Sequence, residues 1–396
     1  MIHLMRFFKG ELSGRLTRFI VWSVLPIGLA VTFALIAYIK ASADRLAERD
    51  FVAECTEVQR ILESRLDDHA RILLSGAALF TVSDAVTREE WRIFAQSLKV
   101  EKQLPGVQGF GFSLVIPRSE LSQHIQKIRS EGFQEYRVRP EGEREVYSSI
   151  IFLEPFSGRN LRAFGYDMFS EPVRRAAMER ARDTDAAALS GKVVLVQETD
   201  QEVQAGTLMY VPVYRKGLPT ATVEQRRAAI IGWVYSPYRM NDLLQGMLGV
   251  TALHQTPKRF LAIYDDARPS PQSLLFGHTP VGQNIRFKRQ TPILFNGHRW
   301  TLCFAQSDGG LYTASYVGVW IIFIGGMLST VLLFALFSVL LNTQTDAQQL
   351  AKAMTADLLK SEESLRQVTE RLSLAARAGG VGHLGLRRGQ QPVRLG

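Results

Sequence analysis

Two long stretches without a charged residue constrain this chain most. Phe19–Ile39 holds 21 consecutive uncharged residues, and Ser315–Leu341 holds 27. A helix of about 20 apolar residues crosses the hydrocarbon core of a bilayer, so both stretches are long enough to span it. The sequence therefore predicts two transmembrane helices, at 19–39 and 315–341, with one large domain between them.

The first apolar stretch has a second interpretation as a cleaved signal peptide, because Ala41-Ser42-Ala43 resembles a cleavage site. Its apolar run exceeds the 7–15 residues of a signal peptide, and the 18 residues before it make a long leader. An uncleaved membrane anchor is the better interpretation.

The basic residues near the spans predict the orientation. The first 18 residues contain four basic residues and one acidic residue, which favours a cytoplasmic amino terminus by the positive-inside rule. Lys40, Arg45 and Arg49 on the other side weaken this signal, but no Lys or Arg lies between Trp300 and Asn342. We therefore expect a multi-pass protein of the cell inner membrane, with both termini inside and a periplasmic domain.

The net charge of +9 is spread along the chain and does not indicate a nucleic-acid partner. The first 18 residues and residues 342–396 each contribute +3, and the remainder is distributed between the spans. No stripe of Lys and Arg with interleaved aromatic residues occurs, so we expect no nucleic-acid binding.

Between the spans the chain alternates helical and strand patterns. After the first span, apolar residues recur at helical spacing from Phe51 to Leu73, which predicts a long amphipathic helix. This helix packs on its own domain, forms a dimerising stalk, or does both. Further helices are expected at Thr87–Leu98, with Thr87 as its N-cap, Pro117–Glu131, from Glu171-Pro172 onward, and Tyr238–Leu248. Strands are expected at Gly106–Ile116, Phe133–Val138, Val146–Leu153, Val193–Val196, Leu208–Val213, Ala228–Tyr235, Phe260–Tyr264, Ser273–Phe276, Ile285–Lys288, Ile293–Phe295 and Trp300–Phe304. Asn296-Gly297 between the last two strands predicts a hairpin turn.

Short motifs in the middle of the chain, among them Gly165-Tyr166-Asp167-Met168, Ser170-Glu171-Pro172 and Arg180-Ala181-Arg182-Asp183-Thr184, resemble those of the CHASE domain, an extracytoplasmic sensing module of bacterial and plant receptors. The resemblance covers roughly Phe80–Tyr214 and rests on several blocks in the right order rather than on any single one. The blocks are Glu154-Pro155, Asn160, Gly165-Tyr166-Asp167-Met168, Ser170-Glu171-Pro172, Arg180-Ala181-Arg182-Asp183-Thr184, Leu189-Ser190-Gly191-Lys192 and Pro212-Val213-Tyr214.

The pattern and the resemblance together predict an α+β fold with two PAS-like α/β lobes between two transmembrane helices. The expected parts are a cytoplasmic tail (1–18), the first span (19–39), a stalk with helices (40–104), a membrane-distal lobe (105–215, with 80–104 completing the CHASE core), a membrane-proximal lobe (216–314), the second span (315–341), a signalling coiled coil (342–376) and a truncated, disordered PAS start (377–396).

The coiled coil rests on a heptad pattern after the second span. Ala351, Leu358, Leu365 and Leu372 occupy one core position over about four heptads. Small or polar residues fill several of the other core positions, so the coil would be weak, as a switching helix requires. An ordinary amphipathic linker helix is the alternative.

The sequence predicts neither a catalytic site nor a cofactor or metal. The seven histidines are scattered without metal-ligand spacing, and no phosphate-binding loop, nucleophile motif, phosphoacceptor block or cyclase motif occurs. Cys55 and Cys303 both fall in apolar patterns, which favours buried free thiols over a disulfide.

The resemblance implies a small-molecule pocket in the membrane-distal lobe. In plant members an Asp on the helix before the Arg-Ala-Arg block holds the ligand, and this position corresponds to Arg174 here. A guanidinium only donates hydrogen bonds, so a cytokinin-like purine is excluded and an anion such as a carboxylate is expected. An Arg exposed on the helix surface is the alternative. The full set of expected pocket residues is Arg174, Ser190, Val196 and Tyr210, with Tyr166 and Asp167 shaping the same region.

These observations predict a membrane-anchored ligand sensor that forms homodimers and contacts membrane lipid. The architecture most resembles the input half of a sensor histidine kinase of a two-component system. The input half of a diguanylate cyclase or phosphodiesterase receptor is one alternative, and a truncated binding-only receptor is another.

Overall fold

The computed structural model describes residues 2–83, 85–99, 106–198, 203–254, 259–278, 280, 284–307 and 312–378. It divides into two compact units. One contains both ends of the chain, and the other contains residues Ser42–Tyr312. The two antiparallel sheets and their helices make the protein an α+β fold, as predicted, with a long apolar helix on each side of the sheets in chain order.

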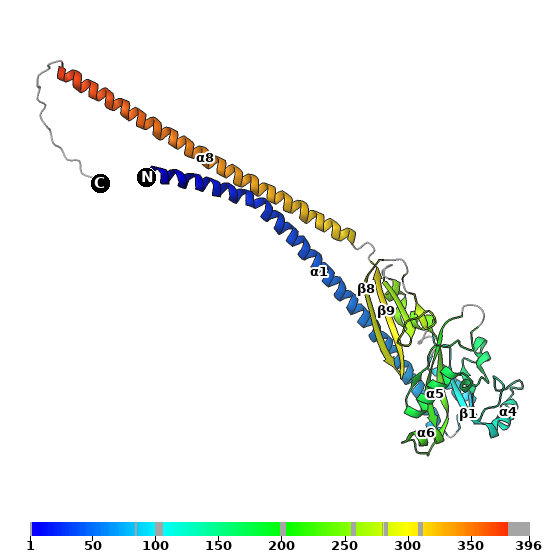
Figure 1. Cartoon of the computed structure of the whole chain (residues 1–396). Helices are drawn as coiled ribbons and strands as arrows, with labels where there is room; N and C mark the ends of the chain where they lie inside the picture. Colours follow the sequence, from blue (N-terminus) through cyan, green and yellow to red (C-terminus); the bar gives the residue numbers. More distant parts are fainter. Residues whose placement is uncertain are drawn as a thin grey trace, which may run out of the picture. The chain divides into compact units, whose positions relative to one another are not determined.

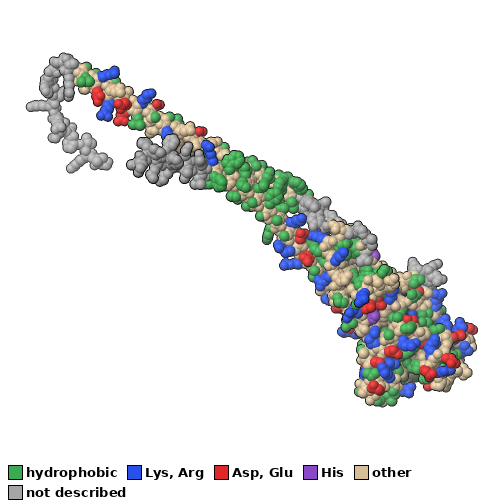
Figure 2. Space-filling model, in the orientation of Figure 1, with side chains coloured by type: hydrophobic (Ala, Val, Ile, Leu, Met, Phe, Trp, Pro, Cys, Tyr) green, Lys and Arg blue, Asp and Glu red, His purple; other side chains and the backbone are tan. Residues whose placement is uncertain are grey.

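The first unit consists of the early part of α1 (Ile2–Val82) and nearly all of α8 (Tyr312–Ala378). Both helices are long and apolar enough to cross a membrane. Figure 2 shows their hydrophobic side chains gathered in one band. Only 11% and 6% of their most apolar windows is buried, whereas the core helix of a soluble protein is mostly buried.

Small residues bring these two helices into close contact. A Cβ atom on Gly28 would collide with Thr330, and one on Gly326 would collide with Thr32. Each threonine donates its hydroxyl hydrogen bond to the glycine carbonyl one turn earlier in its own helix, at 2.8 Å for Thr32 and 2.7 Å for Thr330. Such small-residue contacts are typical of membrane helices, where backbones approach closely without a hydrophobic driving force.

The second unit contains two antiparallel sheets (Figure 1). The larger sheet has the strand order β2-β1-β5-β4-β3, and the smaller has β7-β6-β9-β8. The larger sheet is formed by β1 (Phe110–Pro117), β2 (Val146–Glu154), β3 (Ala188–Leu189), β4 (Gly206–Tyr214) and β5 (Ile230–Arg239). The smaller sheet is formed by β6 (Arg259–Asp265), β7 (Leu274–Gly277), β8 (Ile285–Phe295) and β9 (His298–Ser307).

Shorter helices connect and cover the sheets. Thr87 caps α2 with a capping box that includes Glu90, which confirms the predicted N-cap. These helices are α2 (Arg88–Ser97), α4 (Leu121–Ser130), α5 (Pro172–Thr184), α6 (Val223–Ala229) and α7 (Met240–His254), with 3-10 turns η1 (Arg118–Glu120), η2 (Gly158–Ala163) and η3 (Met168–Ser170).

The larger sheet separates two apolar cores. The C-terminal half of α1 packs into the first core, where Cys55, Leu62, His69 and Leu73 are buried as the amphipathic pattern predicts. The second core lies on the opposite side of the strands and contains Ala177 and its buried neighbours on α5. Alternate residues of each central strand therefore face α1 and α5.

Several predicted strands differ from the observed ones. Phe133–Val138 forms turns and loop, because Tyr136 and Val138 pack beside α4 instead of pairing with a strand. Val193–Val196 makes only an isolated bridge, from Val193 to Gly206, and the edge strand is β3. The two short strands expected at 285–288 and 293–295 are one continuous strand, β8.

The predicted hairpin turn at Asn296-Gly297 is confirmed. Phe295 pairs with His298, so the connection between β8 and β9 has two residues. Both have positive φ, 45° for Asn296 and 69° for Gly297, which matches the twist of antiparallel strands and favours this residue pair. The truncated PAS start predicted at 377–396 lies almost wholly outside the described residues.

Candidate ligand-binding site

Helix α5 presents the principal candidate residue to the larger sheet. Glu171 precedes the helix, and its carboxylate accepts hydrogen bonds from the backbone N–H groups of Val173 and Arg174 at 3.1 and 2.8 Å. Pro172 occupies the first helical position, where its missing N–H costs nothing. The sequence thus fixes where α5 begins, and with it the position of Arg174 in the first turn.

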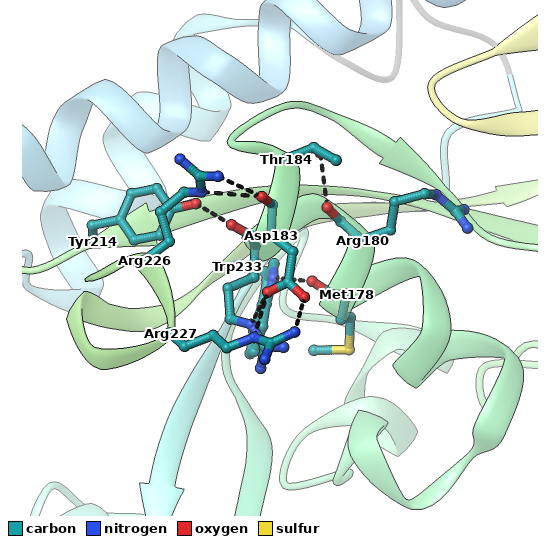
Figure 3. A network of polar contacts seen from close by, with 9 residues as sticks. Met178, Arg180, Asp183, Thr184, Tyr214, Arg226, Arg227 and Trp233 are labelled. Carbon is teal, nitrogen blue, oxygen red and sulfur yellow. Dashed lines mark hydrogen bonds and ion pairs between the residues drawn. The ribbon is translucent and has the colours of Figure 1, made fainter. Parts of the chain in front are cut away.

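The other end of α5 is held by a polar network (Figure 3). Arg227 Nη2 donates to Asp183 Oδ2 at 2.6 Å, and Arg226 donates to the Asp183 backbone carbonyl at 2.7 Å. The hydrogen bond from Arg227 keeps the pKa of Asp183 well below its usual range. Tyr214 and Trp233 add side-chain hydrogen bonds to the carbonyls of Arg182 and Met178. The Arg180–Thr184 block therefore anchors α5.

Arg174 is buried against the sheet, with 3% of its surface exposed. Its Nη2 donates to the carbonyl of Val194 at 2.9 Å, and its guanidinium lies 4.9 Å from the ring centre of Tyr166. Glu171 Oε2 forms an ion pair with Nε at 4.0 Å, beyond hydrogen-bond range, and within the described residues Nε has no hydrogen-bond partner. The alternative of an exposed helix Arg is wrong.

Two buried tyrosines lie near this guanidinium. Tyr210 on β4 and Tyr235 on β5 are register partners with ring centres 6.3 Å apart, and both are fully buried. Neither hydroxyl has a hydrogen-bond partner in the described part of the chain. Burial raises the pKa of both hydroxyls, and the charge of Arg174 offsets part of that rise. Both tyrosines are therefore neutral donors at physiological pH.

Three unsatisfied polar groups thus gather under α5: Arg174 Nε and the hydroxyls of Tyr210 and Tyr235. An unpaired buried donor costs about 1–3 kcal/mol. All three can donate, and one is cationic, so the cluster suits an anion that accepts several hydrogen bonds. No nucleophile with an adjacent base lies in this cluster, and no group of three metal-ligating side chains occurs among the described residues.

The other predicted pocket residues lie close by but have different partners. The Ser190 hydroxyl accepts from Leu208 N at 2.9 Å and donates to the Gly191 carbonyl at 2.8 Å. Asp167 Oδ1 accepts from the backbone N–H groups of Ser148 and Phe169. Burial raises the pKa of Asp167, and these hydrogen bonds oppose the rise.

Val196 lies in a turn two residues after Val194 and is half-buried. The structure therefore brings together Arg174, Tyr166 and Tyr210. It gives Ser190 and Asp167 backbone partners instead. Sequence reasoning missed Tyr235 and the carbonyl of Val194, which complete the surroundings of Arg174.

The edge of the candidate site also touches the smaller sheet. The N–H of Leu189 donates to the carbonyl of Asn296 at 3.1 Å, and Arg180 Nη2 donates to the Leu189 carbonyl at 2.6 Å. The N–H of Lys192 donates to Asp265 Oδ2 at 2.8 Å. The β8–β9 turn is therefore in direct contact with the strand edge beside Ser190, and the Arg180 side chain of α5 lies against Gly297 of the turn.

Comparison with known proteins matches the central part of the chain to a described family. Residues 84–276 match the family described as the CHASE domain. The chain is also 21% identical over 399 aligned positions to a hybrid signal transduction histidine kinase A of Dictyostelium discoideum. That alignment covers 91% of this chain but only 18% of the relative, so the chain spans less than a fifth of the length of the protein it matches.

Proposed function

We propose that this chain, which carries a CHASE domain at residues 84–276, is the membrane-anchored input half of a sensor histidine kinase. The CHASE domain and the similarity to a hybrid histidine kinase support a sensor input role. That same similarity favours a kinase output over a cyclase or phosphodiesterase output. The single observation that carries a ligand-sensing function is the buried, incompletely paired Arg174 beside Tyr210 and Tyr235.

The ligand that suits this site is a small anion, most simply a carboxylate. A carboxylate offers about four lone-pair positions, enough to accept from Arg174 Nε and from both tyrosine hydroxyls. Hydrogen bonds to a charged partner contribute about 1.5–3 kcal/mol each, so the ligand would relieve the cost of three unpaired groups at once.

A route for the signal runs from the site through the smaller sheet. Leu189 donates a hydrogen bond to Asn296 in the turn, Arg180 lies against Gly297, and β9 follows that turn directly. In chain order β9 leads into α8, which we propose crosses the membrane and continues as a cytoplasmic coiled coil. Suppose that the turn can take two positions and that the ligand has a higher affinity for the conformation with one of them. Ligand binding would then shift the equilibrium between two packings of the helices. A homodimer would carry the change across paired α8 helices.

The orientation is tested by cysteine labelling in intact cells with a membrane-impermeant maleimide. Ser130 and Ser361 are both exposed, whereas Ser149 is fully buried and unsuitable. The native thiols give little background, because Cys55 and Cys303 are buried and burial raises the pKa of Cys55 to about 11. We expect labelling of Ser130→Cys and none of Ser361→Cys. The reverse result would overturn an extracytoplasmic sensor.

Ligand binding is tested on the full chain in lipid nanodiscs. A series of monocarboxylates is compared with the corresponding amides, which keep the shape but lose the charge. A ligand that binds the folded state raises the melting temperature by mass action. We expect each carboxylate to raise the melting temperature. The corresponding amide should need at least a tenfold higher concentration to give the same rise. Equal effects of acid and amide would contradict an anion site.

A further inference from the structure

A cleft lies on the opposite face of the larger sheet from α5. It encloses about 840 Å³, within the range of small-molecule pockets. The end of α1, the start of α2 and one side of α4 border it, and strands β1, β2 and β5 line its floor. Its lining includes Phe80, Arg88, Leu114, Lys127, Glu131 and Ile231.

The floor of this cleft is apolar. Phe112 and Leu114 reach it from β1, Ile151 from β2 and Ile231 from β5, and Phe80 of α1 stacks on Phe112 with ring centres 4.2 Å apart. Leu114 and Ile231 are only partly buried, unlike the residues of the sealed core beside them. The floor can therefore gain burial from the apolar body of a ligand, at about 25 cal/mol for each Å² covered.

The charged residues of the cleft are mainly basic. Arg88, Lys127, Arg215 and Lys216 line it, against Glu89 and Glu131. Glu89 is paired with Arg92 at 2.5 Å, so its charge is compensated on its own helix. His124 also lines the wall, and burial lowers its pKa to about 4, so the histidine is neutral at physiological pH. The surplus of positive charge favours an anionic group at the rim.

Arg88 supplies a buried donor that is not fully used. Its Nη1 donates to the carbonyl of Ile151 at 2.7 Å, and its guanidinium lies 4.5 Å from the ring centre of Phe133. Its Nη2 is buried and forms an ion pair with Glu131 Oε2 at 3.7 Å, but it has no hydrogen-bond partner among the described residues. An acceptor entering the cleft would satisfy this N–H group.

We propose that this cleft binds an amphiphilic carboxylate. The apolar body of the ligand lies on Leu114 and Ile231, and the carboxylate accepts from Arg88 Nη2 and pairs with Lys127 at the rim. This site is separate from the one under α5, because the two are on opposite faces of the sheet and share no residue. Phe80 belongs to α1, so an occupant touches the helix that continues toward the first span.

The test uses the full chain in nanodiscs of zwitterionic lipid, with 4-phenylbutyrate as the probe. Its matched controls are 4-phenylbutanamide and 4-phenylbutylamine, which keep the apolar body and change the head group. Isothermal titration calorimetry, with empty nanodiscs as the blank, gives the dissociation constants. We expect the acid to bind at least tenfold more tightly than the amide, and the amine to bind more weakly still.

Variants assign the binding to this cleft. Lys127→Glu should weaken 4-phenylbutyrate at least fivefold, and Ile231→Ala should weaken it by a smaller factor. Lys288→Glu, an exposed charge reversal on β8, should leave its binding unchanged. Lys127 is exposed, so its variant should fold normally. Two results overturn the proposal: equal affinity for acid and amine, or binding that survives Lys127→Glu but is lost in Arg174→Met.

Discussion

Replacing Arg174 with Met or with Ala separates a ligand-binding arginine from a purely structural one. Met keeps most of the side-chain volume but removes the charge. The change loses a charge-assisted hydrogen bond to Val194, worth about 1.5–3 kcal/mol. It also loses the contact with the Tyr166 ring, worth about 0.5–2 kcal/mol. It relieves the unpaired Nε, worth about 1–3 kcal/mol, and the cost of burying a charge.

These contributions nearly cancel, so we expect Arg174→Met to fold within about 1 kcal/mol of the unmodified protein in the absence of ligand. Arg174→Ala also leaves a cavity, because 97% of the residue surface is covered, and should be less stable by about 2–5 kcal/mol. For a unit of this size that lowers the melting temperature by on the order of 10 °C. Both variants should lose carboxylate binding by about tenfold or more.

The assay is the thermal unfolding of the full chain in nanodiscs, followed by tryptophan fluorescence. Trp91, Trp233 and Trp300 are buried in the domain and report on its cores. Carboxylate affinity comes from the shift in melting temperature with ligand concentration. If Arg174→Met is as unstable as Arg174→Ala, the guanidinium is a structural group and the anion-site argument fails. Unchanged carboxylate binding in Arg174→Met would refute it as well.

Three further predictions follow from individual contacts. Burial lowers the pKa of His69 to about 4 from an ordinary 6.5. The free energy of unfolding should therefore fall as the pH drops from 6.5 to 4, by about 3 kcal/mol at most. Urea unfolding at several pH values should show a weaker pH dependence of this free energy in His69→Phe. Asp183→Asn should cost about 1–2 kcal/mol at pH 7. Because the folded-state pKa of Asp183 is lowered, equilibrium unfolding should show this difference above pH ~4 and lose it as the pH falls further. The Cβ atom added in Gly297→Ala would lie 2.7 Å from Arg180 Cδ, so this variant should have a lower melting temperature than Gly217→Ala. Gly217 has a similar positive φ but open space around it, and equal shifts in the two variants would contradict a tight contact at the turn.

Local chemistry made much of this fold predictable. The apolar lengths identified both long helices, and Glu171-Pro172 located the start of α5 because an acceptor and a proline suit the first turn of a helix. Asn296-Gly297 predicted the β8–β9 turn because both positions need positive φ. Each of these signals depends on residues adjacent in the sequence.

The site was harder to predict because its members meet through long-range pairing. Tyr235 lies opposite Tyr210 only in the register of β4 and β5, and α6 with its flanking loops separates those strands. Val193–Val196 has the composition of a strand, yet its Val194 carbonyl accepts a hydrogen bond from Arg174, and the edge strand that pairs with β4 is Ala188–Leu189. Composition and spacing do not tell which of these two segments pairs with β4.

The larger sheet places the two candidate sites where each can affect the same helices. Along β4, Tyr210 belongs to the core under α5, whereas Met209 and Val211 on either side of it belong to the core packed against α1. On β5, Tyr235 belongs to the core under α5 and Val234 belongs to the core packed against α1. A ligand under α5 that moves the β4–β5 pair must therefore also move the surface on which α1 packs, because close-packed interiors transmit displacement rather than absorb it. Direct coupling between the sites follows as a measurable consequence. A carboxylate bound under α5 should change the affinity for 4-phenylbutyrate in the cleft beside Arg88, and by linkage each ligand should alter the affinity for the other by the same factor.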